Sequence, residues 1–216
     1  MKDIKAAKGR YHIARLIEEG EHEQQDFKHS VSDASKIAHS ISAFANHSGG
    51  RLLIGVKDNG AVAGVRNEED IYVVEQAGLS FCRPPQAVTF KAYTAEGGAH
   101  VIVAEVAPSA YKPVKAREHD GTWRAYYRIA DENLVAHPLM VRIWERKSSE
   151  ACGGILSEEH RRFMRSLADI GLFDVSKAAI TAKVSIATAE RLLIDLGALD
   201  LITFRRAGDR FLICFS

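Results

Sequence analysis

Three polar side chains alternate along one predicted strand in a pattern suited to nucleic-acid binding. Arg124, Tyr126 and Arg128 are each separated by one other residue, so they share one face of an extended strand. Two guanidinium groups beside an aromatic ring suit contact with phosphates and stacking on a base. The alternative interpretation is an ordinary solvated sheet face. Three further basic residues precede this strand: Lys112, Lys115 and Arg117.

A second candidate contact lies near the C-terminus. The pattern over 186–196 predicts a helix that Ser185 caps and Gly197 closes. In a helix-turn-helix this helix enters the DNA groove. The residues expected to face the groove are Ser185, Thr188 and Arg191, and those expected to pack inward are Ile186, Leu192, Leu193 and Leu196. The following hairpin supplies Arg205, Arg206 and Arg210 for phosphate contacts. Such modules also bind proteins, which is the alternative.

The pair Gly49-Gly50 has two interpretations. It is either a phosphate-binding turn made of backbone N–H groups or a plain helix C-cap. The sequence has no GxxxxGK[ST] motif, which excludes a P-loop ATPase. A nucleotide-binding regulator that uses this turn stays as a weaker hypothesis. The 9 histidines show no HxxxH or HExxH spacing, so none is assigned to a metal.

The elements that carry these residues predict a mixed α+β fold. Segments 1–147 alternate helices and strands: helices over 8–19, 33–48, 68–82 and 139–144, and strands over 52–56, 87–94, 100–107 and 122–129. Asp33 caps the second helix, and Asn59-Gly60 indicates a hairpin. Residues 148–154 read as a linker. Residues 155–216 predict helices over 157–170, 175–182 and 186–196, with half a capping box at Ser157, and then a hairpin of 199–204 and 210–215 that turns at 206–209. That order is typical of a winged helix-turn-helix.

Composition limits the kind of protein further. The chain of 216 residues has a net charge of +1, so any affinity for nucleic acid must come from local patches. The 3 cysteines form no CxxC pair, which argues against disulfides and a structural zinc site. The sequence has neither a membrane-length apolar run nor a signal peptide. We therefore expect a cytoplasmic protein.

The N-terminal motifs resemble a known family. The run Glu21-x4-Asp26-Phe27-Lys28, followed by the segment from Ser42 to Gly60 that reads SAFANHSGGRLLIGVKDNG, resembles the Schlafen AlbA-like domain. A later family motif corresponds to Tyr127-Arg128, without its usual Gly-Ser. The resemblance covers roughly residues 10–145. It implies a DNA-binding or transcription-regulating protein, often fused to a winged helix, and a homodimer that builds a two-lobed cleft.

The same resemblance implies an alternative activity. In animal Schlafen proteins the matching acidic positions form an endoribonuclease site, and here they fall on Glu21, Asp26 and Asp58. Such carboxylates would hold Mg²⁺ or Mn²⁺; without nuclease activity no cofactor is expected. A bend near Glu23 has to bring Glu21 and Asp26 together, because a spacing of five separates them on a regular element. The alternative is that these acids are solvated or pair with Lys28 and Lys57, and that Asp58 only begins the turn.

The sequence thus favours a nucleic-acid-binding protein, and specifically a DNA-binding transcription regulator. Arginines 124, 128, 205, 206 and 210 would supply affinity, and Ser185, Thr188 and Arg191 would supply specificity. A metal-dependent endoribonuclease is the alternative, and a nucleotide-binding regulator is the weaker one. We expect the protein to bind DNA in preference to RNA and to form a homodimer. We expect no membrane association.

Overall fold

The computed structural model describes residues 6–65, 69–149, 156–208 and 210–216. Contacts divide the chain into two compact units, Met1–Ala136 and His137–Ser216. Among the described residues, none of the helices has the length and apolar character that crossing a membrane requires. The fold is mixed α+β, as the sequence predicts.

A five-stranded mixed sheet forms the centre of the first unit. Its order is β1-β5-β6-β3-β2, with β2 parallel to β3, β1 parallel to β5, and the other pairs antiparallel. The strands are β1 (Ala7–Lys8), β2 (Gln25–Lys28), β3 (Gly50–Ile54), β5 (Val88–Thr94) and β6 (His100–Val106).

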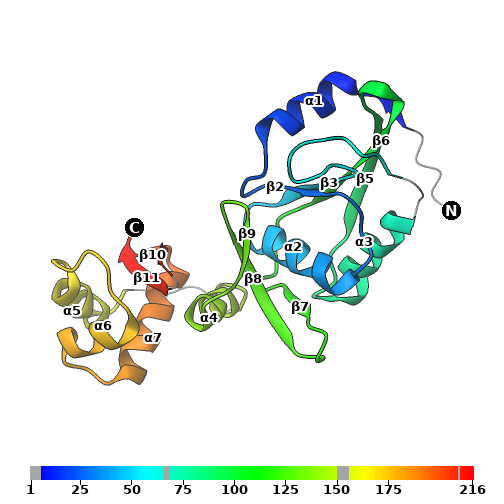
Figure 1. Cartoon of the computed structure of the whole chain (residues 1–216). Helices are drawn as coiled ribbons and strands as arrows, with labels where there is room; N and C mark the ends of the chain where they lie inside the picture. Colours follow the sequence, from blue (N-terminus) through cyan, green and yellow to red (C-terminus); the bar gives the residue numbers. More distant parts are fainter. Residues whose placement is uncertain (1–5, 66–68, 150–155, 209) are drawn as a thin grey trace. The chain divides into compact units, whose positions relative to one another are not determined.

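Helices cover both faces of this sheet (Figure 1). Helix α1 (Arg10–Glu19) lies on one face, and α2 (Ala34–Asn46) and α3 (Glu69–Ser80) lie on the other. The strand β3 alternates accordingly: Leu53 packs with the α1 side, while Leu52 and Ile54 pack with the α2 side. The continuous apolar run in this strand is therefore explained by burial on both faces.

Local signals in this unit are confirmed. Asp33 caps α2 by accepting hydrogen bonds from the backbone N–H groups of Ser35 and Lys36. Asn59-Gly60 forms the turn, where Val56 bridges Val62 and Gly60 takes a φ of 79°. The short 3-10 turn Glu96–Gly98 joins β5 to β6.

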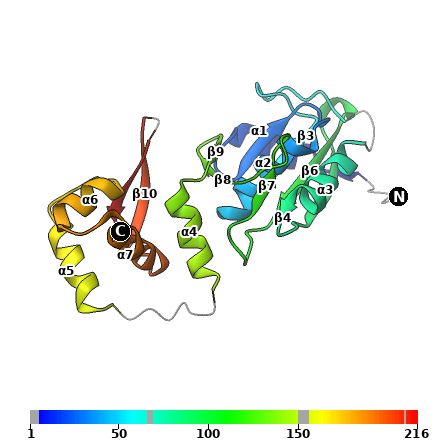
Figure 2. The same ribbon diagram turned by 90° about the horizontal axis from the view of Figure 1, so that it is seen from below.

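A second, four-stranded sheet packs against α2 (Figure 2). Its order is β4-β7-β8-β9, and every pair is antiparallel. The strands are β4 (Cys82–Arg83), β7 (Lys115–Arg117), β8 (Trp123–Ile129) and β9 (Glu132–Val135). The sequence predicted β8 but not its short neighbours, because strands of two to four residues carry too little periodicity to identify.

The second unit contains helices and one hairpin around its own core. The elements are α4 (Pro138–Lys147), α5 (Glu158–Leu167), α6 (Val175–Ala182), α7 (Ile186–Ala198), β10 (Ile202–Ala207) and β11 (Arg210–Phe215). Buried residues from each of the helices meet in this core, including Ile143, Phe163, Ala179 and Leu192. The bounds of α6 are those predicted. The predicted turn at 206–209 is shorter, because β10 extends to Ala207; Asp209 lies outside the described residues.

The unit boundary differs from the predicted linker at 148–154, of which residues 150–154 lie outside the described part. Helix α4 packs on α7 instead of belonging with the first unit. Gly197 explains this contact, since a Cβ there would lie 2.3 Å from the Ile143 Cδ1 atom. Gly197 therefore does not close α7, which was the prediction; the helix continues through it because a close helix–helix approach needs its missing side chain.

Two further details of this unit correct the predictions. The capping box of α5 is complete: Ser157 and His160 satisfy each other's backbone N–H groups, with His160 in the place usually held by Glu or Gln. Ile186 does not pack inward and is 61% exposed, because it is the first residue of α7 and precedes the buried stripe.

Candidate functional site

Glu21 and Asp26 meet at a tight bend before β2. His22 and Gln25 exchange backbone hydrogen bonds of 3.0 Å in both directions, which reverses the chain between the two acids. Glu21 accepts a hydrogen bond of 2.8 Å from the backbone N–H of Phe27. Its carboxyl group lies close enough to Asp26 for the two to interact. The bend that the sequence required near Glu23 is therefore present.

The Asp26 carboxylate lies beside Glu21, and a neighbouring negative charge disfavours ionisation of the Glu21 carboxyl group. Burial raises the pKa of Glu21 most strongly, and the hydrogen bond with Asp26 and its negative charge raise it further. The Phe27 N–H group and the Lys28 charge act in the opposite direction. The pKa of Glu21 is thus raised above its ordinary value.

Asp26 is buried among cationic and hydroxyl partners. Lys28 Nζ lies 2.8 Å from Asp26 Oδ2, and Arg128 Nη2 lies 3.8 Å from Oδ1. The Ser40 hydroxyl donates to Oδ2 at 3.3 Å. The interpretation in which Asp26 pairs with Lys28 is confirmed, and the second cation, Arg128, was not anticipated.

Asp58 does not join this pair. It is exposed in the turn after β3. Among the described residues, no three His, Cys, Asp or Glu side chains gather closely enough to hold a metal ion. The predicted cluster of Glu21, Asp26 and Asp58 is therefore wrong for this fold, and the residues present do not fit a Mg²⁺ or Mn²⁺ site.

Arg128 is the centre of the buried network and is not a surface residue. Its side chain is 0% exposed. It donates to the His22 and Gln25 carbonyl oxygens at 3.1 and 2.9 Å and to Asn133 Oδ1 at 2.8 Å. Burial lowers the pKa of Arg128, and the charges of Asp26 and Glu21 raise it. Arg128 thus fixes the bend that joins the two acids.

The predicted face of Arg124, Tyr126 and Arg128 exists but points inward. Tyr126 is 8% exposed, and its ring stacks on His39 of α2 at a centroid distance of 4.2 Å. Its hydroxyl donates to Glu118 at 2.6 Å. Of the three residues only Arg124, near the start of β8, is exposed. The prediction of a nucleic-acid contact by Tyr126 and Arg128 is therefore wrong, because this face packs on α2.

The double glycine works as a helix stop. The Gly49 N–H group donates to the Phe44 carbonyl oxygen at 2.9 Å, so it is not available to a phosphate. Gly49 has a φ of 81°, and a Cβ on Gly50 would lie 2.2 Å from a Phe44 ring carbon. Cap geometry and close packing account for both residues, and the Gly49 part of the predicted phosphate-binding turn is wrong.

Asn46 of the same motif has a structural task that sequence reasoning missed. Its amide donates to the carbonyl oxygens of Val114 and Tyr126 at 2.8 and 2.9 Å, and its oxygen accepts from Val114 N–H at 2.7 Å. The Ser42 hydroxyl adds a bond of 2.8 Å to the Val114 carbonyl. These two side chains tie α2 to β8 and the segment before β7. A polar residue at four-residue spacing within an apolar helix was the available signal.

In the second unit, the predicted contact residues lie at the start of α7. Ser185 is the N-cap and accepts from the Thr188 N–H at 3.0 Å. Arg191 is exposed but pairs with Glu159 at 2.8 Å and with Asp195 at 3.8 Å. Arg205 and Arg206 are exposed on β10, and Arg206 donates to the Gly208 carbonyl oxygen at 3.1 Å. Arg210 begins β11, and its side chain lies outside the described part.

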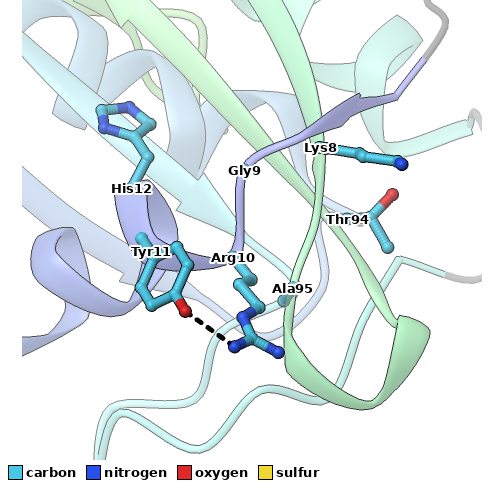
Figure 3. A pocket seen from close by; sticks show the side chains of 7 residues that line it. All are labelled: Lys8, Gly9, Arg10, Tyr11, His12, Thr94 and Ala95. Atoms are coloured by element: carbon cyan, nitrogen blue, oxygen red, sulfur yellow. Dashed lines mark hydrogen bonds between the residues drawn. The ribbon is translucent and has the colours of Figure 1, made fainter.

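A hollow of about 570 Å³ lies where β1 meets α1 (Figure 3). Arg10 donates to the hydroxyl of Tyr11 at 2.8 Å, and Lys8 and Thr94 line the other side. Tyr11 is 77% exposed. This hollow was not predicted from the sequence, because β1 was not predicted.

The fold and these motifs define the first unit as an AlbA-like domain, with the helix, double-glycine stop and buried strand in sequence. The chain belongs to the family described as Schlafen, AlbA_2, which matches residues 21–137, more than half of its length. This family is associated with nucleic-acid binding.

Other comparisons are more distant. No match is found among curated proteins. The crystal structure of the DIP2311 protein from Corynebacterium diphtheriae is similar at 18% identity and a TM-score of 0.44. The match covers 68% of this chain and 30% of that one, so the chain spans less than a third of that protein.

Proposed function

We propose that this protein is a DNA-binding transcription regulator whose second unit acts as a winged helix-turn-helix. The observation that carries the proposal is the order α5, α6, α7 and hairpin, with only Lys183, Val184 and Ser185 between α6 and α7. Lys183 takes the left-handed conformation, with a φ of 55°, which turns the chain sharply between the two helices. A turn of this length is typical of helix-turn-helix motifs.

The hairpin is attached to the helices as a wing would be. Phe173, just before α6, exchanges backbone hydrogen bonds with Ile213 of β11 at 3.0 and 2.7 Å. Burial of Phe173 and Ile213 in the same core fixes β11 beside the helices. The far end of the hairpin, with exposed Arg205 and Arg206, extends away from this anchor. These two arginines are our candidates for phosphate contacts, with Arg210 opposite Ala207 as the third.

The start of α7 is open for base contacts. Ser185, Ile186 and Ala187 are exposed, and Thr188 is partly exposed. The N-terminal residues of a recognition helix are those that reach base edges. Arg191 would have to break its ion pairs with Glu159 and Asp195 before it could contact a base. We therefore assign it the weakest contribution to base recognition.

Titration of a duplex of about 30 base pairs at several salt concentrations tests the proposal. Replacing Arg205 and Arg206 by Ala should lower the slope of log K against log salt by about two and weaken binding. Arg161 and Arg165 on α5, which pair with Glu158, are the charge-matched control for the same double change. Equal loss in both double variants, or no loss in either, would reject the hairpin as the contact.

We also infer that the protein acts as a homodimer on DNA. Helix-turn-helix dimers read two half-sites about one helical turn apart, which doubles the contact area of a small module. Light scattering of the free and DNA-bound protein tests this. A complex of one chain per duplex at saturation would contradict it.

A further inference from the structure

The outer face of the small sheet carries a second cationic and aromatic surface, which we call the Trp123 face: Arg83, Lys115, Arg117 and Trp123. Register places Arg83 opposite Lys115, and Arg117 opposite Trp123. Residues directly opposite in an antiparallel pair point to the same side. Ala116, between the two basic residues of β7, is buried toward α2, so Lys115 and Arg117 point outward.

A hollow of about 450 Å³ lies beside this face, at the end of α3. Arg83, Arg117 and Trp123 line it together with Leu79 and Pro85. The Arg83 guanidinium lies over the Trp123 ring, 4.5 Å from its centroid. This volume lies within the range of about 300–1,000 Å³ for small-ligand sites. The hollow thus offers an aromatic surface and two guanidinium groups at one place.

Two acidic residues, Glu118 and Asp120, follow β7 in the chain. Glu118 accepts a hydrogen bond of 2.6 Å from the Tyr126 hydroxyl on the inner side of the sheet. Asp120 accepts hydrogen bonds from the Thr122 backbone and hydroxyl at 2.9 and 2.7 Å. The Trp123 face thus carries the three cationic side chains of Arg83, Lys115 and Arg117, although the net charge of the chain is only +1.

We propose that the Trp123 face binds single-stranded nucleic acid, with one base in the hollow and its flanking phosphates on Arg83, Lys115 and Arg117. Aromatic stacking requires a free base face, which a paired base inside a duplex does not offer. The arginines and the lysine would follow the backbone on either side. This site is separate from the duplex contact proposed for the second unit and does not rest on it.

Tryptophan fluorescence tests the site directly. The chain has 2 tryptophans, so Trp144→Phe leaves Trp123 as the single reporter. Addition of an oligothymidylate or oligouridylate of about 15 nucleotides should quench this fluorescence, while a blunt duplex of equal length should not. Absence of quenching by both single strands would overturn the proposal. Equal quenching by thymidine monophosphate at the same nucleotide concentration would also overturn it, in favour of a mononucleotide site.

Substitutions locate the contact. Arg83→Gln and Arg117→Gln should each weaken single-strand binding several-fold and lower its salt slope by about 0.7. Arg15→Gln, on α1 beyond the opposite face of the large sheet, is the charge-matched control and should change neither. Trp123→Ala should weaken binding about tenfold, measured by anisotropy of a labelled strand, and Trp123→Phe should keep most of it. Arginine variants that match Arg15→Gln would refute the site.

The two proposals fail separately. Replacing Arg205 and Arg206 should reduce duplex binding and leave single-strand binding intact. Replacing Arg83 and Arg117 should do the reverse. Loss of single-strand binding in the Arg205/Arg206 variant alone would move that activity to the second unit and reject the Trp123 face.

Discussion

The guanidinium of Arg128 lies over the ring of Phe44, 4.8 Å from its centroid. This contact joins two of the three motifs through which the sequence resembles its family, because Phe44 lies in the Ser42–Gly60 segment and Arg128 in the later motif on β8. Its other side chain bonds reach the bend at His22–Gln25 and Asn133 of β9. One buried cation thus connects four separate segments of the first unit.

Removing this cation should be costly. Arg128→Met keeps most of the volume but removes one of the two cations that lie beside buried Asp26 and leaves Lys28. Breaking a buried ion pair on one side costs about 3–5 kcal/mol. We expect a loss of that size in the free energy of unfolding, measured in urea. Arg124→Met, at the exposed end of the same strand, should cost less than about 1 kcal/mol; equal losses would contradict the assigned role.

Asn46 should be nearly as important to stability. Asn46→Ala leaves the Val114 N–H and the Tyr126 carbonyl without their side-chain partner in a buried place. Each unsatisfied buried group costs about 1–3 kcal/mol, so we expect a total loss of about 3 kcal/mol in urea unfolding. Asn59→Ala, which removes one bond to Ala61 in an exposed turn, is the control. A difference below 1 kcal/mol between the two would show that water replaces the Asn46 amide.

Glu21 should make stability depend on pH. Its pKa is raised above the ordinary 4.5 in the folded state, so the folded protein binds more protons than the unfolded chain just above that pH. The contribution to stability is therefore full below about 4.5 and is lost as pH rises through the folded pKa. Glu21→Gln should remove this dependence and gain stability relative to wild type between pH 4.5 and 7. Parallel curves of unfolding free energy against pH for the two proteins would contradict a raised pKa of Glu21 in the folded state.

The double-glycine stop offers a test with a built-in control. Gly49 and Gly97 have nearly the same φ, 81° and 80°. A Cβ at Gly49 would lie 2.8 Å from the Val106 carbonyl oxygen, whereas nothing lies within 4 Å at Gly97. Gly97→Ala should cost only the left-handed strain, about 1–2 kcal/mol. Gly49→Ala should lower the melting temperature clearly further, and an equal drop in both would mean that the contact at Val106 relaxes.

Much of the fold follows from local sequence signals. Four features depend only on residues that are close in sequence, so local patterns predict them. They are the Asp33 cap, the Gly49-Gly50 helix stop, the apolar run of β3 and the turn at Asn59-Gly60. The helix at 175–182 is predicted to the residue for the same reason. The family resemblance rests on these same local features.

Tertiary packing decided which of the candidate site residues are buried and which are exposed. The sequence determined that Arg124, Tyr126 and Arg128 share a face, because side chains in a strand alternate with period two. Which of the two faces turns toward α2 depends on Asn46, Ser42 and Phe44, which lie about 80 residues away in the chain. Likewise, the bend at His22–Gln25 brought Glu21 to Asp26, while Asp58 stayed in its exposed turn. The sequence alone determined which side chains share a face of a strand. Only long-range packing decided which side chains contact each other and which are exposed to solvent.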